Sequence, residues 1–245
     1  MTPPPPLTFN AWLRHDLIFE ALEGLEIDSV LEIGAGGGAM GARLAERFDY
    51  VGLEPDPASF ETARGRIEEP GLGRVVNGDA TALPEGATFD LVCAFEVLEH
   101  IEDDADALRS WRTRIAPGGW LLLSVPAFQR RFGPWDDRVG HFRRYDPLDM
   151  RTLLLSTGFD VPVISTYGFP LGNALERSRN LVARSDRRRS DAMDERTAAS
   201  GRSLQMPNAL GQVSRAATAP FRWIQRGFTS GKHGTGLVVL AGRDA

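Results

Sequence analysis

The fold of this chain is decided by the stretch Leu31-Glu32-Ile33-Gly34-Ala35-Gly36-Gly37-Gly38. A short apolar run at residues 29–33 passes directly into glycines, and a helical pattern follows over residues 39–48. Glycine permits a sharp turn and the close approach of a ligand to the backbone. The start of a helix also favours a negatively charged group nearby. The stretch therefore indicates a strand–turn–helix unit that can cradle a nucleoside-like ligand.

An acidic residue, Glu54, supports this interpretation, because it ends the next apolar run, residues 50–53. A carboxylate at that place can accept hydrogen bonds from both hydroxyls of a ribose. Nicotinamide or flavin enzymes and methyltransferases share this fingerprint. The spacing Gly34-x-Gly36-x-x-Ala39 also satisfies a loose dinucleotide pattern, so the residues alone leave both classes open.

Short apolar runs alternate with helical patterns along residues 9–166, which is typical of βαβ units on a parallel sheet. The pattern predicts an α/β fold with a doubly wound, mostly parallel sheet. Strands are expected at residues 29–33, 50–53, 74–77, 89–95, 120–125, 159–166 and 237–241. Helices are expected at residues 9–24, 39–48, 57–68 and 103–115, and after Asp146 as the N-cap.

Four regions are predicted along the chain. Residues 1–8, which are rich in proline, form a disordered tail, and residues 9–166 form the ligand-binding α/β core. Residues 167–236 are too long for an ordinary connection and form an insertion. This insertion has helical pieces at 171–184 and 208–228 around a polar, mobile stretch at 185–203, and residues 237–245 return as the final strand of the core.

Composition bounds the function. Cys93 is the single cysteine, which excludes an intrachain disulfide and a cysteine-based zinc site and fits the cytoplasm. No metal site is predicted. The sequence gives no indication of the oligomeric state. No apolar run is long enough to span a membrane. The segment 219–228 mixes aromatic residues with arginines and is expected to pack on the domain, with peripheral membrane contact as the alternative.

Charge is divided unevenly between the two halves of the chain. Residues 1–110 carry a net charge of −15 and residues 111–245 a net charge of +10. The basic half is consistent with an anionic partner. Solvated acidic helix faces in the first half explain the division equally well.

The pattern E-x-G-x-G-x-G at residues 32–38 resembles motif I of the class I S-adenosylmethionine-dependent methyltransferases. Segments that resemble the family's later motifs follow in order: VGLEPD at 51–56, GDATALP at 78–84, FDLV and FEVLEH within 89–100, and APGG at 116–119. The resemblance covers about residues 28–126. It implies a seven-stranded Rossmann-like sheet whose last strand lies antiparallel beside the fifth, and S-adenosyl-L-methionine as the cofactor.

The resemblance also implies roles for individual residues. The backbone at Gly34, Gly36 and Gly38 would line the methionine and ribose portions of the cofactor, and Glu32 would help to anchor the methionine end. Glu54 would bind the ribose hydroxyls, and Asp79 would accept from the adenine amino group with Ala80 at the ring's edge. Phe95 and Glu96 would border the methyl-transfer site.

Two histidines are candidate catalytic bases. His100 lies in the FEVLEH segment, where a loop-positioning role is the alternative, and His141 lies in GHFRRY, residues 140–145. The GHFRRY stretch resembles a segment in a subset of the family. Arg143, Arg144 and Tyr145 could clamp a carboxylate or phosphate of the substrate. Structural ion pairs with the neighbouring acids at 136, 137 or 149 are an equal alternative.

These observations together predict an S-adenosylmethionine-dependent methyltransferase that acts on a small-molecule or lipid-linked acceptor with an acidic group. A nucleic-acid or protein methyltransferase is an alternative. The segment FEVL at 95–98 stands where enzymes that methylate nucleic-acid amino groups commonly carry an Asn/Asp-Pro-Pro-aromatic tetrapeptide. A nicotinamide-dependent oxidoreductase and a non-catalytic binding module are the further alternatives.

Overall fold

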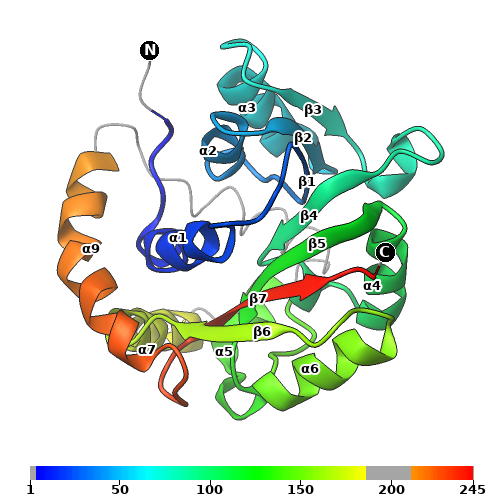
Figure 1. Cartoon of the computed structure of the whole chain (residues 1–245). Coiled ribbons are helices and arrows are strands. Elements are labelled where there is room, and N and C mark those ends of the chain that lie inside the picture. The colour runs from blue at the N-terminus through cyan, green and yellow to red at the C-terminus, as the bar shows by residue number, and fades with distance from the viewer. Residues whose placement is uncertain (1–3, 186–210, 245) are drawn as a thin grey trace.

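The computed structural model describes residues 4–185 and 211–244, and its centre is a mixed β-sheet (Figure 1). The strand order is β3-β2-β1-β4-β5-β7-β6. The strands are β1 Ser29–Ile33, β2 Asp49–Glu54, β3 Arg74–Asn77, β4 Phe89–Phe95, β5 Ile115–Pro126, β6 Val163–Tyr167 and β7 Gly236–Gly242. β7 pairs antiparallel with both β5 and β6, whereas the other neighbours are parallel. The predicted fold class and the antiparallel last strand are confirmed.

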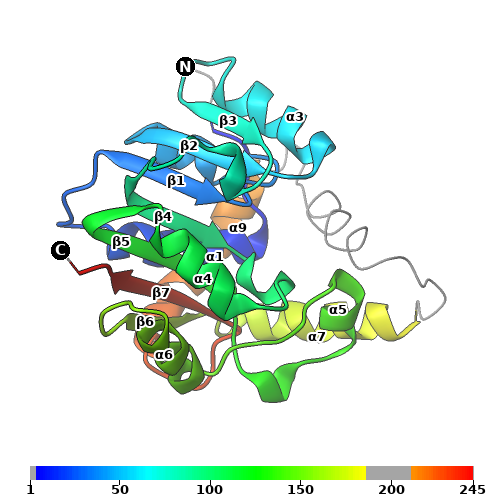
Figure 2. The same cartoon turned by 90° about the vertical axis from the view of Figure 1, so that its right-hand side faces the viewer.

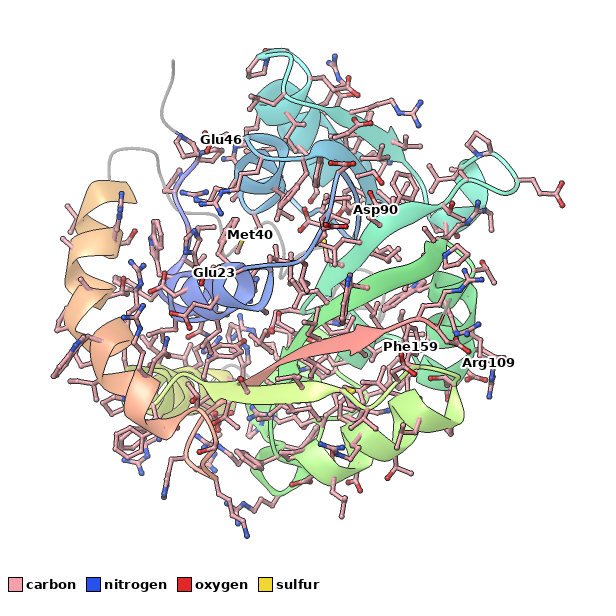
Figure 3. All side chains as sticks on the ribbon, viewed as in Figure 1. Glu23, Met40, Glu46, Asp90, Arg109 and Phe159 are labelled. Atoms are coloured by element: carbon pink, nitrogen blue, oxygen red, sulfur yellow. The ribbon has the colours of Figure 1, made fainter. Side chains whose placement is uncertain are left out.

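Helices cover both faces of the sheet. They are α1 Phe9–Ala21, α2 Gly41–Ala45, α3 Pro57–Ile67, α4 Asp104–Arg112, α5 Pro134–Val139, α6 Pro147–Ser156, α7 Leu171–Ser185 and α9 Gly211–Gln225. α1, α2 and α9 lie on one side of the sheet and α4 and α6 on the other (Figure 1). Met40 and Phe159, both labelled in Figure 3, belong to the two separate apolar clusters that these layers bury.

The strand β4 shows why the sheet is buried on both faces. Leu91, Cys93 and Phe95 pack into the cluster beneath α1, whereas Val92 and Ala94 pack into the cluster beneath α4. Successive side chains of a strand point to opposite faces, so an uninterrupted apolar run is what a doubly covered strand requires. Cys93 is therefore a buried packing residue.

Several predicted boundaries differ from the structure. α1 ends at Ala21 rather than residue 24, and α2 spans five residues rather than the predicted ten. β6 begins at Val163, four residues later than expected, and β5 begins at Ile115, five residues earlier. β5 carries a register shift against the start of β4, which lengthens it through the Pro-Gly-Gly segment that was expected to be only a turn.

The two sides of the insertion form helices, as the sequence predicts. α9 packs along α1 in Figure 1, and α7 lies against α5 in Figure 2. The Trp12 indole Nε1 donates to Ser214 Oγ at 3.1 Å and so ties α1 to α9. Apart from Ser185, which ends α7, the stretch expected to be mobile, 185–203, lies outside the described residues.

The predicted disordered tail differs from the structure at its end nearest α1. Leu7 is only 3% exposed and belongs to the apolar cluster beneath α1. Its carbonyl oxygen accepts from Ser214 Oγ at 3.2 Å. An apolar residue that directly follows a run of prolines carries no periodic signal, so the sequence could not reveal this contact.

The aromatic and basic stretch at 219–228 divides its apolar side chains between the domain and the solvent. Phe221 packs against the cluster beneath α1, whereas Trp223 is 75% exposed. The prediction that this stretch packs on the domain is therefore correct for only part of it. Within residues 4–185 and 211–244, no helix combines the length and the apolar character needed to cross a membrane.

The contact of Trp12 with α9 generates a stability prediction. Trp12→Ala should lower the free energy of unfolding by about 3–5 kcal/mol, because a large buried ring is removed and leaves a cavity. Trp223→Ala, on the exposed side of α9, is the matched control and should change it by less than about 0.5 kcal/mol. Urea unfolding followed by circular dichroism measures both. Equal losses in the two variants would contradict the packing described here.

Candidate functional site

The loop after β1 turns through three glycines with left-handed backbone. Gly34, Gly36 and Gly38 have φ angles of 72°, 54° and 73°. A Cβ atom at Gly34 would lie 2.6 Å from Val97 Cγ2, whereas a Cβ at Gly36 would meet nothing within 4 Å. Residues other than glycine rarely adopt this backbone conformation. Gly34 is therefore required by close packing as well, and Gly36 borders open space where a ligand can approach.

Glu54 lies directly beside this loop. Its Oε2 accepts from the Gly36 amide at 2.7 Å, and its Oε1 accepts from the Asp56 amide at 2.8 Å. Burial raises the pKa of Glu54, and these two amide hydrogen bonds oppose the rise. A carboxylate oxygen can accept more than one hydrogen bond. The carboxylate is thus held in place by the backbone and retains capacity for a ligand's hydroxyl groups.

Glu32 is buried within β1 beneath the glycine loop. The Tyr50 hydroxyl donates to its Oε2 at 2.6 Å. Burial raises the pKa of Glu32 to about 7, while the Tyr50 hydrogen bond and the positive charge of Arg14 oppose the rise. A nearby positive charge favours the ionised form of a buried acid in this condition.

Asp79 and Ala80 follow β3 at the same edge of the sheet. Asp79 Oδ1 accepts from the backbone amide of Thr81 at 2.8 Å and from its hydroxyl at 2.6 Å. These bonds with Thr81 lower the pKa of Asp79. Ala80 begins the short 3₁₀-helix Ala80–Ala82, which Asp79 caps. The structure thus places an exposed, ionised carboxylate at the edge where Glu54 ends β2.

The end of β4 presents Glu96 in a left-handed backbone conformation, with φ of 60°. Its Oε1 accepts from Ser124 Oγ and from the Tyr167 hydroxyl, each at 3.0 Å, and lies 3.6 Å from Arg14 Nη1. Phe95, predicted to border the same site, is buried in the core cluster beneath α1. Glu96 is therefore the side chain of this pair that projects toward the rim.

His100 and His141 are brought together although 40 residues separate them. Their rings meet edge to face with centroids 4.7 Å apart, and His100 Nδ1 faces the Gly140 carbonyl oxygen at 3.2 Å. Burial lowers the pKa of His100 to about 4, and the nearby His141 adds to the effect. His100 is therefore neutral at neutral pH and a weak base. His141 Nδ1 pairs with Asp136 Oδ1 at 2.8 Å.

Glu99, which the sequence did not single out, is fully buried next to the two histidines. It is 0% exposed, and its Oε1 lies 3.9 Å from His141 Nε2. Neither carboxylate oxygen has a hydrogen-bond partner among the residues that the structure describes. Burial raises the pKa of Glu99 well above its usual range, and the charge of Glu96 adds to the rise.

The GHFRRY segment makes internal ion pairs. Arg144 donates to both oxygens of Asp136, from Nε at 2.8 Å and from Nη2 at 2.7 Å, and its side chain is only 4% exposed. The buried Tyr145 hydroxyl donates to Asp104 Oδ2 at 2.9 Å, and Arg143 Nη1 lies 2.7 Å from the same oxygen. This arrangement contains the ion pair with Asp136 that the structural alternative predicts, and it adds Asp104 as a partner.

Two other arginines reach the same region from helices. The Nε atoms of Arg14, from α1, and Arg179, from α7, are buried without a hydrogen-bond partner within residues 4–185 and 211–244. The charges of Glu96 and Glu99 act on Arg14, and the charge of Glu96 acts on Arg179. Arg179 lies in the predicted insertion, where its sequence neighbourhood carries no catalytic signal.

Comparison with known proteins identifies the family. Residues 11–162 match the family model described as a methyltransferase domain. The ubiquinone biosynthesis O-methyltransferase of Leptothrix cholodnii is 32% identical over 125 residues, which are 49% of this chain and 51% of that protein. The match thus spans about half the length of this curated relative.

Solved structures share the fold. The phosphoethanolamine N-methyltransferase 2 of Haemonchus contortus, in complex with S-adenosyl-L-methionine, has a TM-score of 0.61 at 14% identity, covering 95% of this chain and 52% of that chain. The aminopentose methyltransferase CalS10 of Micromonospora echinaspora has a TM-score of 0.53 at 21% identity, covering 66% and 88%. Likeness at these identities concerns the fold.

The family model covers more than half of the chain, and the sheet order and the glycine loop with Glu54 agree with it. The chain therefore belongs to the class I S-adenosylmethionine-dependent methyltransferases.

Proposed function

We propose that this protein transfers a methyl group from S-adenosyl-L-methionine to an oxygen of a small-molecule or lipid-linked acceptor. The observation that carries the proposal is the hydrogen bond of 2.7 Å from the Gly36 amide to Glu54, because it holds a carboxylate beside the open glycine turn, where that carboxylate would bind a ribose. The relatives named ubiquinone biosynthesis O-methyltransferases support an oxygen acceptor. The cofactor's sulfonium supplies an electrophilic methyl group, so the protein's task is alignment.

The residues at the carboxyl ends of β1, β2 and β3 would hold the cofactor. Glu54 would accept from the ribose hydroxyls, and Asp79 from the adenine amino group, with Ala80 at the ring's edge. The glycine turn would border the methionine portion, and Glu32 would attract its ammonium group. Ligands of open α/β sheets bind at this edge.

The acceptor would lie beyond β4, between Glu96 and the helices α1 and α7. The buried, unpartnered Nε atoms of Arg14 and Arg179 support an acceptor that carries an acidic group, because each retains a hydrogen bond to give. In this proposal the GHFRRY segment builds the wall of the acceptor site through its ion pairs, and Phe95 supports that wall from the core.

Peripheral contact with a membrane would suit a lipid-linked acceptor. The exposed Trp223 stands on α9 between Arg222 and Arg226, a mixture that favours an anionic interface. Arg222 and Arg226 also pair with Asp16 and Glu20 of α1, which reduces the charge available to lipid. A cytoplasmic location, with or without such contact, remains a prediction.

The cofactor assignment predicts selective losses of affinity. Glu54→Ala and Asp79→Ala should each weaken binding of S-adenosylhomocysteine by about 10- to 100-fold, because charged hydrogen bonds contribute about 1.5–3 kcal/mol. Glu61→Ala, an exposed acid on α3, is the control and should bind normally. Calorimetric titration measures all three, with NADH as the competing candidate. Unchanged affinity in both site variants, or binding of NADH alone, would refute the assignment.

Because the pKa of Glu32 is raised, we expect cofactor binding to depend on pH. Its pKa of about 7 means that Glu32 is about half protonated at pH 7, and an adjacent ammonium group favours the ionised form. Affinity for S-adenosylhomocysteine should therefore rise between pH 5 and pH 8, with proton release at pH 7. Titration calorimetry in buffers of different ionisation enthalpy detects the released proton. Glu32→Gln should abolish the release, and persistence of the release in that variant would refute the role.

The pairing of Arg144 with Asp136 predicts a loss of stability. Arg144→Ala should lower the free energy of unfolding by about 3–5 kcal/mol, because Asp136 would lose its bidentate buried partner. Arg109→Ala, at an exposed pair on α4 labelled in Figure 3, should cost less than about 0.5 kcal/mol. Urea unfolding compares them. Full stability of the Arg144 variant together with lost acceptor turnover would instead support the substrate clamp.

A further inference from the structure

Three side chains at the acceptor edge converge on one point. Glu99, His100 and His141 each offer a ligand atom, and these atoms all lie within 4.8 Å of one another. Glu99 and His100 come from the short 3₁₀-helix Leu98–His100 after β4, whereas His141 follows α5. The sequence did not reveal the cluster, because the two parts are far apart along the chain.

The surroundings of Glu99 independently favour a cation at this point. Its carboxylate is fully buried, and both oxygens lack a hydrogen-bond partner in the described part of the chain. Buried polar groups in native proteins are almost always hydrogen-bonded, and a buried charge needs a paired charge or a metal ion. An acid in this position is stabilised either by a proton or by a cation, and the imidazole of His141 lies toward the same oxygen.

Groups outside the cluster orient the two imidazoles. Asp136 Oδ1 accepts from His141 Nδ1 at 2.8 Å, which turns Nε2 toward Glu99. Arg144 holds Asp136 from the other side through two hydrogen bonds. The carbonyl oxygen of Gly140 engages His100 Nδ1. Carboxylates and backbone carbonyls that bind the second nitrogen of an imidazole are characteristic of histidines that ligate metals.

We propose that Glu99, His100 and His141 bind a divalent transition-metal ion beside the methyl-acceptor site. Two imidazole nitrogens and one carboxylate oxygen suit Zn²⁺, Mn²⁺, Fe²⁺ or Co²⁺ better than Mg²⁺ or Ca²⁺, which prefer oxygen ligands. Three protein ligands also leave at least one coordination position open. The charge of Glu96 acts on both Glu99 and His100, so Glu96 lies close to this cluster.

The role of the ion rests on the proposed function, whereas its binding does not. A cation at this point would hold an oxygen of the acceptor and lower the pKa of a hydroxyl there. His100 and His141 would then act as metal ligands instead of as the catalytic base. An acceptor with an oxygen able to reach the ion is the substrate class that follows.

The test measures metal binding directly on the full, untagged chain after removal of metal with a chelator. Calorimetric titration with Co²⁺ and Zn²⁺ alone should give one saturable site per chain, and the visible spectrum of bound Co²⁺ should report nitrogen and oxygen ligands. Glu99→Gln and His141→Gln should each weaken Co²⁺ binding by about 100-fold. Loss of a residue that only supports a ligand can already weaken metal binding by that factor, so loss of a ligand should cost at least as much. His233→Gln, an exposed histidine elsewhere, is the control and should bind as the original chain does.

Absence of a saturable site in the original chain, or equal Co²⁺ affinity in Glu99→Gln, would overturn the proposal in favour of a protonated Glu99. Thermal unfolding checks that each variant folds, and the glutamine at 99 keeps the shape of the side chain while removing its charge. Titration of the same samples with S-adenosylhomocysteine separates the two proposals. If the original chain binds Co²⁺ but not S-adenosylhomocysteine, the result contradicts the methyltransferase function and still supports the metal site.

Discussion

The close approach of the loop after β1 to the segment after β4 is the constraint on which both halves of the site depend. Gly34 leaves no space for a side chain because Val97 packs against it. Further along the same loop, the Gly36 amide donates a hydrogen bond to Glu54. Glu99 and His100 follow Val97 after a single residue, Leu98. One tight contact therefore fixes the loop after β1 and the segment after β4 relative to each other, and the proposed in-line transfer between them would require this.

The proposed acceptor edge is organised around the buried carboxylate of Asp136. Asp136 accepts from His141 and receives both donors of the Arg144 guanidinium, and Arg144 also reaches Glu176 of α7. A planar guanidinium matches a carboxylate in this bidentate way, which a lysine could not do. The GHFRRY segment thus connects α5, α7 and the segment after β4. At this place, Arg143 and Arg144 form ion pairs within the protein.

Sequence reasoning identified the features whose signal is local. The glycine turn and Glu54 follow from a short motif, and the strands follow from alternating apolar patterns. The antiparallel place of the last strand was predicted from the family resemblance. The partners of Arg144 and Tyr145 could not be predicted, because Asp104 comes from a distant helix and three acids near the segment were equally available. The isolation of Glu99 is likewise a property of its surroundings in space. The contacts that Leu7 and α9 make with α1 and with each other could not be predicted for the same reason.

The position of β7 has a consequence for how the protein folds during synthesis. β7 lies between β5 and β6 and supplies the hydrogen-bonding partner of both. Until residues 236–242 leave the ribosome, the edges of these two strands have no partner, and the apolar side chains beside them are exposed. Unpaired strand edges are prone to pair with other chains. These two strands therefore stay open to pairing with other chains until β7 has been made, although β5 and β6 themselves are synthesised well before it.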